Sequence, residues 1–440
     1  MLSFGTDGVR GRALTELTTS YVASLGSAAG RVLGGGRWLI GRDTRESGPV
    51  LEASLVAGLR AAGAEPLSLG VVPTPALAHL SAVTGVPAAM ITASHNPFHD
   101  NGIKVFAPGG LKLSDSIEAS IEAAIEPFDG EFDASEVVVA PATDVTLATY
   151  ADHVVALFPM NALAGLRLVL DCANGAMSGV APLVASRLGA DVVVIHASPD
   201  GRNINAGCGA TDASSLAAAV VEHGAALGLA FDGDGDRVIA VDEHGTTVDG
   251  DRLIALAALQ LRDAGELVDD TVVVTVMSNL GFHRAMEQAG IHVVSTAVGD
   301  RYVLEALDRG GWSIGGEQSG HIIYRRLAST GDGLLAGMRL AQFVHDHGAP
   351  LSVLARDVMT GYPQVLVNVE VAARHPQVAD ELAVELAAAE RELGGEGRIL
   401  LRPSGTEPLV RVMVEAATAV DAQRIADDLA AVVEARFGHR

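Results

Sequence analysis

The sequence predicts an α/β protein in which strands and helices alternate along most of the 440 residues. Apolar residues make up 49% of the chain and are mostly Ala, Val and Leu, whereas aromatic residues make up only 4%. Together with 50 glycines, this composition suits alternating strands and helices better than a β-sandwich. Alternation of this kind favours parallel or mixed sheets, in which sites gather at the carboxyl ends of strands.

Length and charge limit the possible functions. A chain of 440 residues is expected to form roughly two to four domains. The net charge of −24 argues against nucleic acid or an acidic membrane as a partner. No apolar run reaches the roughly 18 residues of a membrane span, and the N-terminus lacks the features of a signal peptide. Because Cys172 and Cys208 are the only cysteines, no disulfide framework is implied, and we expect a cytoplasmic protein.

The first two predicted units are α/β. Residues 1–143 begin with a glycine-rich segment at 4–11, followed by strands at 38–40, 66–69, 88–91 and 104–106 and helices at 49–62 and 114–125. The stretch 126–143 is rich in Pro, Asp and Glu and is typical of a linker. Residues 144–248 contain helices at 145–158 and 180–188 and strands at 166–170, 192–195, 227–231 and 238–241.

The third unit repeats this plan, and the last one differs from it. Residues 249–360 contain strands at 271–276 and 293–297, a glycine-rich loop at 313–321, and helices at 251–262, 280–289, after 298–302 and at 334–346. Residues 361–440 form a smaller α+β unit with strands at 365–371, 398–401 and 410–414 and helices at 379–393 and 420–437.

Ser94 is the first candidate site residue. It follows an apolar run at 87–91, on a loop shaped by His95, Asn96 and Pro97, so we expect it to be exposed and held in place. Adjacent residues of an extended segment point opposite ways, which predicts that His95 is poorly placed as a base for Ser94. The loop histidine would instead help to bind a phosphate. An ordinary transition from strand to loop is the alternative.

Cations near this loop are candidates for binding an anion. Of the 30 lysines and arginines only Lys104 and Lys112 are lysines, and Lys104 follows Ser94 by ten residues. A partly desolvated lysine can titrate, whereas arginine effectively cannot, so we interpret Lys104 as functional. Arg10, among the glycines of segment 4–11, is a candidate to hold a phosphate.

Three aspartates give the most specific chemical signal. Asp232, Asp234 and Asp236 alternate with glycines after the strand at 227–231, so their carboxylates should face one point. Crowded carboxylates need a cation, and oxygen donors without nearby His or Cys favour Mg²⁺ over zinc. A calcium-binding EF-hand loop is excluded because Arg237 occupies the position that needs glycine and the flanking segments resemble strands.

Two further polar loops suit a phosphorylated sugar. Residues 402–408, with Arg411 downstream, supply guanidinium groups, two hydroxyls and backbone N–H donors, which is the chemistry of a phosphate site. In segment 317–321, an acid, an amide, a hydroxyl and an imidazole lie around Gly320, a mixture that suits sugar hydroxyls. For His321 the sequence does not distinguish a structural role from a catalytic one. Arg301, at a predicted helix start, binds an anion or helps to cap the helix.

Taken together, the loops at 92–97, 232–237, 317–321 and 402–408 resemble the serine, metal, sugar and phosphate loops of the α-D-phosphohexomutase superfamily. Their order and spacing agree over essentially the whole chain. Within the superfamily, segment 4–11 and Gln318 resemble the bacterial phosphoglucosamine mutases, whereas phosphomannomutase/phosphoglucomutase relatives typically carry Met in place of that glutamine. Thr92 stands where this branch often has Ser. The resemblance implies four domains around a central cleft, three of them related.

The resemblance also implies a reaction and its participants. Glucosamine 6-phosphate and glucosamine 1-phosphate would interconvert through a phosphoserine at Ser94 and a glucosamine 1,6-bisphosphate intermediate, on the route to UDP-N-acetylglucosamine and the cell wall. One Mg²⁺ per subunit would be held by Ser94 and the three aspartates. Arg10, Lys104, His95 and His321 would serve the reacting group, with Lys104 or His321 moving the proton. The substrate-binding residues would be Glu317, Ser319, Arg237, Arg301, Arg402, Ser404, Gly405, Thr406 and Arg411.

Other interpretations stay open at this point. A mutase for glucose or mannose phosphates is the nearer one, and a metal-dependent phosphatase or a non-catalytic sugar-phosphate sensor belongs to another class. The expected partner is a small-molecule sugar phosphate in each case. The sequence does not decide the oligomeric state, and a homodimer is the assembly left open.

Overall fold

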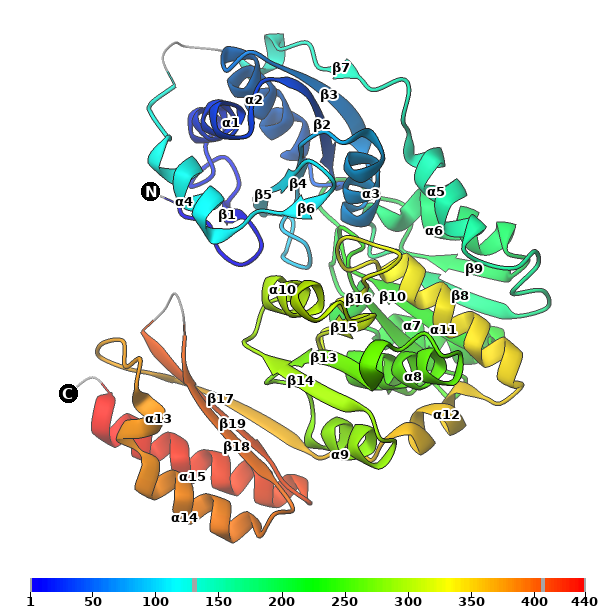
Figure 1. Ribbon diagram of the computed structural model, residues 1–440, viewed down its shortest axis with the longest axis vertical. Coiled ribbons are helices and arrows are strands. Elements are labelled where there is room, and N and C mark those ends of the chain that lie inside the picture. The colour runs from blue at the N-terminus through cyan, green and yellow to red at the C-terminus, as the bar shows by residue number, and fades with distance from the viewer. Residues whose placement is uncertain (1, 129–132, 405–407, 439–440) are drawn as a thin grey trace. The chain divides into compact units, whose positions relative to one another are not determined.

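The described residues form four sheets (Figure 1), and these belong to two compact units. The structure is a computed structural model that describes residues 2–128, 133–404 and 408–438. One unit comprises residues 1–277 and 291–358 and holds three sheets; the other comprises residues 278–290 and 359–440 and holds the fourth. Each unit is described by itself.

The first sheet is mixed, with the strand order β1-β5-β4-β2-β3-β7 and β6 paired to β5. Its strands are β1 (Val9–Arg12), β2 (Gly36–Arg42), β3 (Ala64–Val71), β4 (Ala88–Ile91), β5 (Asp100–Ala107), β6 (Leu111–Lys112) and β7 (Ala140–Pro141). Its helices are α1 (Thr19–Leu33), α2 (Gly48–Ala61), α3 (Thr74–Thr84) and α4 (Asp115–Ala123). A Cβ on Gly58 of α2 would lie 1.9 Å from the carbonyl oxygen of Ala23 in α1, so this glycine lets the two helices pack closely.

The second sheet, of order β12-β11-β10-β8-β9, is parallel in its β10-β8-β9 part and antiparallel beyond β10. It consists of β8 (Arg167–Asp171), β9 (Asp191–Ile195), β10 (Leu227–Phe231), β11 (Val238–Asp242) and β12 (Thr247–Val248). The helices of this segment are α5 (Leu147–Ala156), α6 (Met177–Arg187) and α7 (Ser214–His223). All residues of β10 are buried, which explains its continuous apolar sequence.

The third sheet, of order β14-β13-β15-β16, has an antiparallel edge strand beside parallel ones. Its strands are β13 (Thr271–Thr275), β14 (His292–Thr296), β15 (Ile314–Gly316) and β16 (Ile322–Tyr324). Its helices are α8 (Gly250–Asp263), α10 (Asp300–Gly310), α11 (Gly333–His347) and α12 (Leu351–Val358). Short 3₁₀ turns lie at η1 (Ala134–Glu136), η2 (Gly209–Thr211) and η3 (Val268–Asp270).

The second unit is built on an antiparallel sheet of order β17-β19-β18. It contains β17 (Gln364–Glu370), β18 (Arg398–Pro403), β19 (Leu409–Glu415), α9 (Leu280–Gln288), α13 (Val378–Glu381), α14 (Ala383–Leu393) and α15 (Ala419–Phe437). Helix α9 comes from the chain between β13 and β14, yet it belongs here because its N-terminal Leu280 amide donates to Glu415 at 3.0 Å.

The predicted fold class is confirmed: three sheets are mixed α/β and the C-terminal one is smaller and α+β. Several details differ. The loop predicted at 313–321 contains strand β15, the helix predicted at 379–393 is divided into α13 and α14, and the linker at 126–143 adds β7 to the first sheet. Helices α1, α3, α7 and α12 were not predicted. The limits of the four domains remain a prediction. Among the helices described, none combines the length and hydropathy that a membrane crossing requires.

Candidate active site

The serine loop begins where β4 ends, and its conformation is unusual. Ser94 has a φ of +52°, in the left-handed region, and the residue has no solvent exposure. It is therefore buried, contrary to the prediction that it is exposed. The amide of Ser94 donates to the Thr92 hydroxyl at 2.9 Å, and that hydroxyl donates to Asp43 at 2.7 Å.

The left-handed backbone also changes the position of His95. Its Nδ1 lies 3.4 Å from the Ser94 hydroxyl, so the prediction that the two side chains point apart is wrong, because the segment is not extended there. Burial, followed by the charges of Arg237 and Arg10, lowers the pKa of His95 to about 4. The imidazole is therefore neutral at physiological pH beside the serine oxygen.

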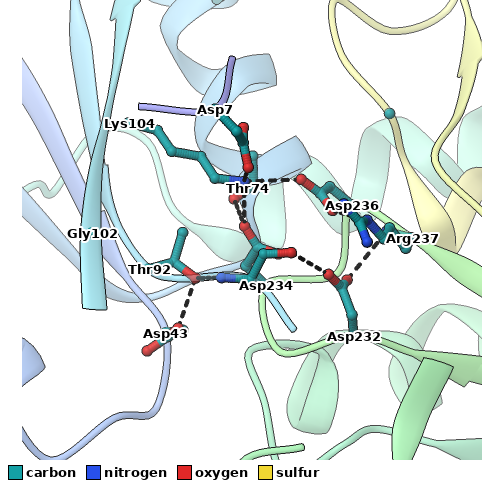
Figure 2. A network of polar contacts seen from close by, with 12 residues as sticks. Asp7, Asp43, Thr74, Thr92, Gly102, Lys104, Asp232, Asp234, Asp236 and Arg237 are labelled. Carbon is teal, nitrogen blue, oxygen red and sulfur yellow. Dashed lines mark hydrogen bonds and ion pairs between the residues drawn. The ribbon is translucent and has the colours of Figure 1, made fainter. Parts of the chain in front are cut away.

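The three aspartates lie together as the alternation predicts (Figure 2). They follow β10, are at most 3% exposed, and carry oxygens that all lie within 4.8 Å of one another. The Ser94 hydroxyl donates to Asp232 at 2.6 Å, so the serine and the aspartates form one site. Burial, with the charges of Asp236 and Asp234, raises the pKa of Asp232 well above its usual range.

These carboxylates fit a hard cation. Oδ1 of Asp234 and Oδ1 of Asp236 are buried and accept no hydrogen bond from the described residues. Buried carboxylate oxygens without a donor are costly unless a cation reaches them. Since the donors are all oxygens, Mg²⁺ is the ion that suits this set.

Lys104 links the aspartates to the N-terminal segment. Its Nζ lies 2.9 Å from Asp234, 3.0 Å from Asp236 and 2.9 Å from Asp7. Burial alone would lower the pKa of Lys104, but the three carboxylates raise it well above the usual value. The three carboxylates therefore favour the charged form of Lys104, and its role in moving a proton stays a prediction.

The N-terminal segment contributes charged side chains to the site, of which only Arg10 was predicted. Asp7 pairs with Arg10, Lys104 and Lys112, and these cations hold the pKa of the Asp7 carboxyl well below its usual range although burial acts to raise it. Thr74, at the start of α3, donates its hydroxyl to Asp234 at 2.6 Å. Asp7 was visible in the glycine-rich segment, whereas Thr74 lies in an apolar stretch and gave no signal.

A cavity of about 360 Å³ lies beside this network. Asp236, Arg237, His321 and Glu317 contribute to its wall, together with Arg10. Its size falls within the range of small-molecule sites, which is roughly 300–1,000 Å³. The lining is the following set of residues: Ser3, Gly5, Thr6, Asp7, Gly8, Arg10, Asp236, Arg237, Val298, Gly299, Asp300, Glu317 and His321.

The predicted sugar loop is a tight turn between β15 and β16. The Gly320 amide donates to Glu317 O at 2.9 Å, and Glu317 Oε1 accepts the Gly299 amide at 3.1 Å. Ser319 is exposed and is not part of the cavity lining. Burial alone would lower the pKa of His321, but Asp300 and Asp236, 3.4 and 3.7 Å from its ring nitrogens, raise it.

Arg301 is engaged elsewhere in the first unit. Its guanidinium pairs with Asp115 and Glu118 of α4, so it links α10 to α4 and does not line the cavity.

The predicted phosphate loop lies in the second unit. Arg402 and Arg411 are direct partners on β18 and β19, and burial and the charge of Arg411 lower the pKa of Arg402. Two arginines placed opposite each other are unfavourable without an anion between or beside them. Ser404 lies at the end of β18, and Gly405 and Thr406 lie outside the described residues.

One residue that supports the serine loop from a distant part of the chain was not predicted. Arg45 is fully buried and donates to the carbonyl oxygens of Ser94 and Asn96 at 2.9 Å, and to Asp43 at 2.8 Å. Asn205 donates to the same two carbonyls at 2.9 and 3.1 Å. Segment 41–45 carries two arginines at the end of β2, and the sequence does not show that the Arg45 side chain points inward.

Four family models match the chain, and each describes one domain of the phosphoglucomutase/phosphomannomutase family. The α/β/α domains I, II and III match residues 1–129, 148–245 and 249–362, and the C-terminal domain matches residues 366–432.

Full-length relatives and solved structures agree with this. The chain is 52% identical to the phosphoglucosamine mutase of Rhodococcus jostii, with 98% of each chain covered. It is similar in fold to a phosphoglucomutase/phosphomannomutase family protein of Burkholderia thailandensis, with a TM-score of 0.80, 24% identity and coverage of 99% and 98%. A N-acetylphosphoglucosamine mutase of Aspergillus fumigatus, solved with GlcNAc-6P and magnesium, matches with a TM-score of 0.69 at 20% identity, covering 98% of this chain and 95% of that one.

Proposed function

The chain belongs to the phosphoglucomutase/phosphomannomutase family, and we propose that it interconverts D-glucosamine 6-phosphate and α-D-glucosamine 1-phosphate as a phosphoglucosamine mutase. The observation that carries this proposal is the buried Ser94 hydroxyl, 2.6 Å from Asp232 at the edge of a three-aspartate site. The 52% identity over 98% of the chain supports the amino sugar as substrate. Such an enzyme would act in the cytoplasm.

Ser94 serves as a phosphoryl carrier in this reaction. The Ser94 phosphoryl group passes to the free hydroxyl of the sugar phosphate, and the resulting glucosamine 1,6-bisphosphate returns its other phosphoryl group to Ser94. The serine oxygen is the leaving group in the first step and the nucleophile in the second, so the enzyme is regenerated. Asp232, Asp234 and Asp236, together with the phosphorylated Ser94, would hold Mg²⁺, which would neutralise charge during the transfer.

The chain's own cations complete the site. Lys104 remains charged next to Asp234 and Asp236, and Arg10 and Arg237 line the adjacent cavity, where they bind the reacting phosphoryl group. The neutral His95, whose Nδ1 lies 3.4 Å from the Ser94 hydroxyl oxygen, takes part in the transfer of the phosphoryl group. Because His321 is held between Asp236 and Asp300 and lines the cavity, it is the better proton carrier of the two candidates first considered.

The remaining groups bind the sugar and its second phosphate. Glu317 and Ser319 bind hydroxyls common to both orientations of the bisphosphate, with Glu317 in the cavity wall. The facing pair Arg402 and Arg411, with Ser404, Gly405 and Thr406, grips the phosphate that does not react. Arg301 positions α10 against α4 and supports the site indirectly.

The test combines mass and turnover. Intact-mass analysis of the purified protein should show one phosphate, absent from Ser94→Ala, and this variant should lose measurable turnover while keeping the thermal midpoint of the wild type. Ser116→Ala is a matched control, since its exposed hydroxyl lies on α4 away from the cavity lining. Turnover should be higher on glucosamine 6-phosphate than on glucose or mannose 6-phosphate.

Other outcomes identify the alternatives. Stoichiometric release of inorganic phosphate would indicate a phosphatase, and binding of sugar phosphate without any label on Ser94 would indicate a sensor. Full turnover by unphosphorylated protein in the absence of a sugar bisphosphate would contradict the mechanism in which Ser94 carries the phosphoryl group.

A further inference from the structure

A second group of metal-binding side chains lies outside the aspartate site, at the carboxyl ends of two strands of the second sheet. Asp171 ends β8, His196 follows β9, and Cys208 precedes the turn η2. Their ligand atoms all lie within 4.8 Å of one another. The three residues come from three separate segments, so their convergence is a product of the fold.

The side chains face a common point. Asp171 and Cys208 are fully buried, and the His196 side chain is 31% exposed, which leaves one side open for entry of an ion. Nδ1 of His196 lies 3.1 Å from Oδ2 of Asp171 but forms no hydrogen bond with any described residue. A buried ring nitrogen of this kind needs a partner, and an ion placed between nitrogen, oxygen and sulfur would supply one.

The donor set differs in kind from the aspartate triplet. A thiolate, an imidazole and a carboxylate are the ligands of a thiophilic divalent ion such as Zn²⁺, whereas Mg²⁺ takes oxygen ligands. Coordination by Cys208 would require the loss of the thiol proton, since the thiolate is the metal ligand. A tetrahedral ion would keep its fourth position for water on the exposed His196 side.

The loops around this group are held in costly conformations. His196, Ala173 and Asn205 have φ values of +47°, +52° and +56°, in the left-handed region that non-glycine residues seldom adopt. Asp171 accepts the amides of Ala173 at 2.9 Å and Gly209 at 3.0 Å, so its carboxylate already organises two of the loops.

The same loops reach the serine loop. Asn205, three residues before Cys208, donates its amide group to the carbonyl oxygens of Ser94 and Asn96. The backbone amide of Asn205 donates to Ala173 O at 2.9 Å. An ion bound to Cys208 would therefore fix the segment that supports the serine loop.

We propose that Asp171, His196 and Cys208 form a second metal site, specific for a thiophilic divalent cation such as Zn²⁺, that stiffens the support of the serine loop. The site holds its ion independently of Mg²⁺ at the aspartates. It does not depend on the reaction proposed above, because it is defined by its ligands.

Spectroscopic titration of the full chain with Co²⁺, a stand-in for Zn²⁺, tests the proposal. Millimolar Mg²⁺ is kept present so that the aspartate site is occupied. We expect one equivalent of Co²⁺ to bind with a near-ultraviolet thiolate charge-transfer band, and Zn²⁺ to displace it. An all-oxygen site cannot produce this band, so the two sites are distinguishable.

Two alanine variants make a matched pair, since the chain has only two cysteines. Cys208→Ala should lose the band, whereas Cys172→Ala, the other buried cysteine, should keep it. His196→Gln should weaken Co²⁺ binding by more than the roughly 10–100-fold that loss of an outer-shell partner costs. Hydrogen exchange of residues 203–209 should slow on addition of Zn²⁺ in the wild type and not in Cys208→Ala.

The absence of a thiolate band in the wild type, or a band that persists in Cys208→Ala, would overturn the proposal. Thermal unfolding shows whether each variant is folded. Should Cys208→Ala not fold, the partly exposed His196→Gln decides: an unchanged Co²⁺ affinity in that variant also overturns the site.

Discussion

The replacement Arg45→Met should be among the most damaging changes outside the aspartate site. The Arg45 side chain is fully buried, and its guanidinium donates to the carbonyl oxygens of Ser94 and Asn96 at 2.9 Å, to Asp100 O at 3.0 Å and to Asp43 at 2.8 Å. One side chain thus satisfies several buried acceptors of the serine loop. Methionine would fill a similar volume but donate no hydrogen bond, so the Ser94 and Asn96 carbonyl oxygens would keep only Asn205 as a side-chain donor, and Asp43 would lose its charged partner.

The size of the effect follows from the buried charge that remains. Removing one partner of a buried ion pair costs about 3–5 kcal/mol, because the other charge is left uncompensated. With about 2–4 °C per kcal/mol for a domain of roughly 150–250 residues, the thermal midpoint should fall by roughly 6–20 °C. Turnover should fall as well, since the carbonyl groups of Ser94 and Asn96 lose one of their two side-chain donors and hold the serine less firmly.

Thermal unfolding monitored by circular dichroism at pH 5 and pH 8 would measure this. Burial already raises the pKa of Asp43 despite its pairing with Arg45, so in Arg45→Met the carboxyl can take up a proton. A folded-state pKa above the unfolded one stabilises at low pH and loses this contribution as the pH rises. The deficit relative to the wild type should therefore be smaller at pH 5 than at pH 8.

Two companion variants separate charge from shape. Arg45→Lys keeps the charge but cannot reach all the acceptors, so it should lie between the wild type and Arg45→Met. Adding Asp43→Asn to Arg45→Met should recover part of the lost stability. A midpoint for Arg45→Met within about 2 °C of the wild type would refute the reasoning, since it corresponds to a loss of no more than about 1 kcal/mol.

Three further predictions rest on buried or partly buried groups. Tyr150→Phe should lower the free energy of unfolding by about 1–3 kcal/mol, since the Tyr150 hydroxyl donates to both oxygens of Asp332 at 2.8 Å. Because burial raises the pKa of Asp332 to about 6, the loss of unfolding free energy measured in urea should be larger at pH 8, where Asp332 is charged, than at pH 5. Burial and the neighbouring His153 lower the pKa of His79 to about 4, so the stability of the wild type should fall as the pH drops from 6.5 towards 4. In urea unfolding, His79→Gln should show a smaller fall over this range. Parallel curves of unfolding free energy against pH for the two proteins would contradict this prediction. Lys104→Met should bind Mg²⁺ more tightly by calorimetry yet turn over more slowly, and weaker Mg²⁺ binding would show that Lys104 supports the metal site.

Sequence patterns predicted those parts of the site that are formed by residues close together in the chain. Alternation after a buried strand placed Asp232, Asp234 and Asp236 together, and the structure confirms their convergence. The carboxyl ends of strands located Ser94 in the same way. Thr74 could not be found, because its hydroxyl meets Asp234 only through a contact between residues 160 positions apart.

The prediction of side-chain directions failed where the backbone adopts a left-handed φ value. The argument that Ser94 and His95 point apart assumed an extended segment, and the φ of +52° at Ser94 removes that assumption. Nothing in the sequence marks a left-handed serine, since that conformation costs free energy on its own. It persists because Arg45 and Asn205, far away in the sequence, both donate to the Ser94 carbonyl oxygen.

The protonation state of Lys104 shows the same limit in electrostatic form. A lone buried lysine tends to lose its proton, which made Lys104 a reasonable candidate for proton transfer. In the fold, Asp234 and Asp236, which lie 130 and 132 residues further along the chain, and Asp7 raise the pKa of Lys104 against the effect of burial. Since the sign of the shift depends on contacts that only the fold creates, residue type alone does not predict which of these side chains can move a proton. We propose His321 for that role, because Asp236 and Asp300 lie 3.7 and 3.4 Å from its ring nitrogens in the wall of the same cavity.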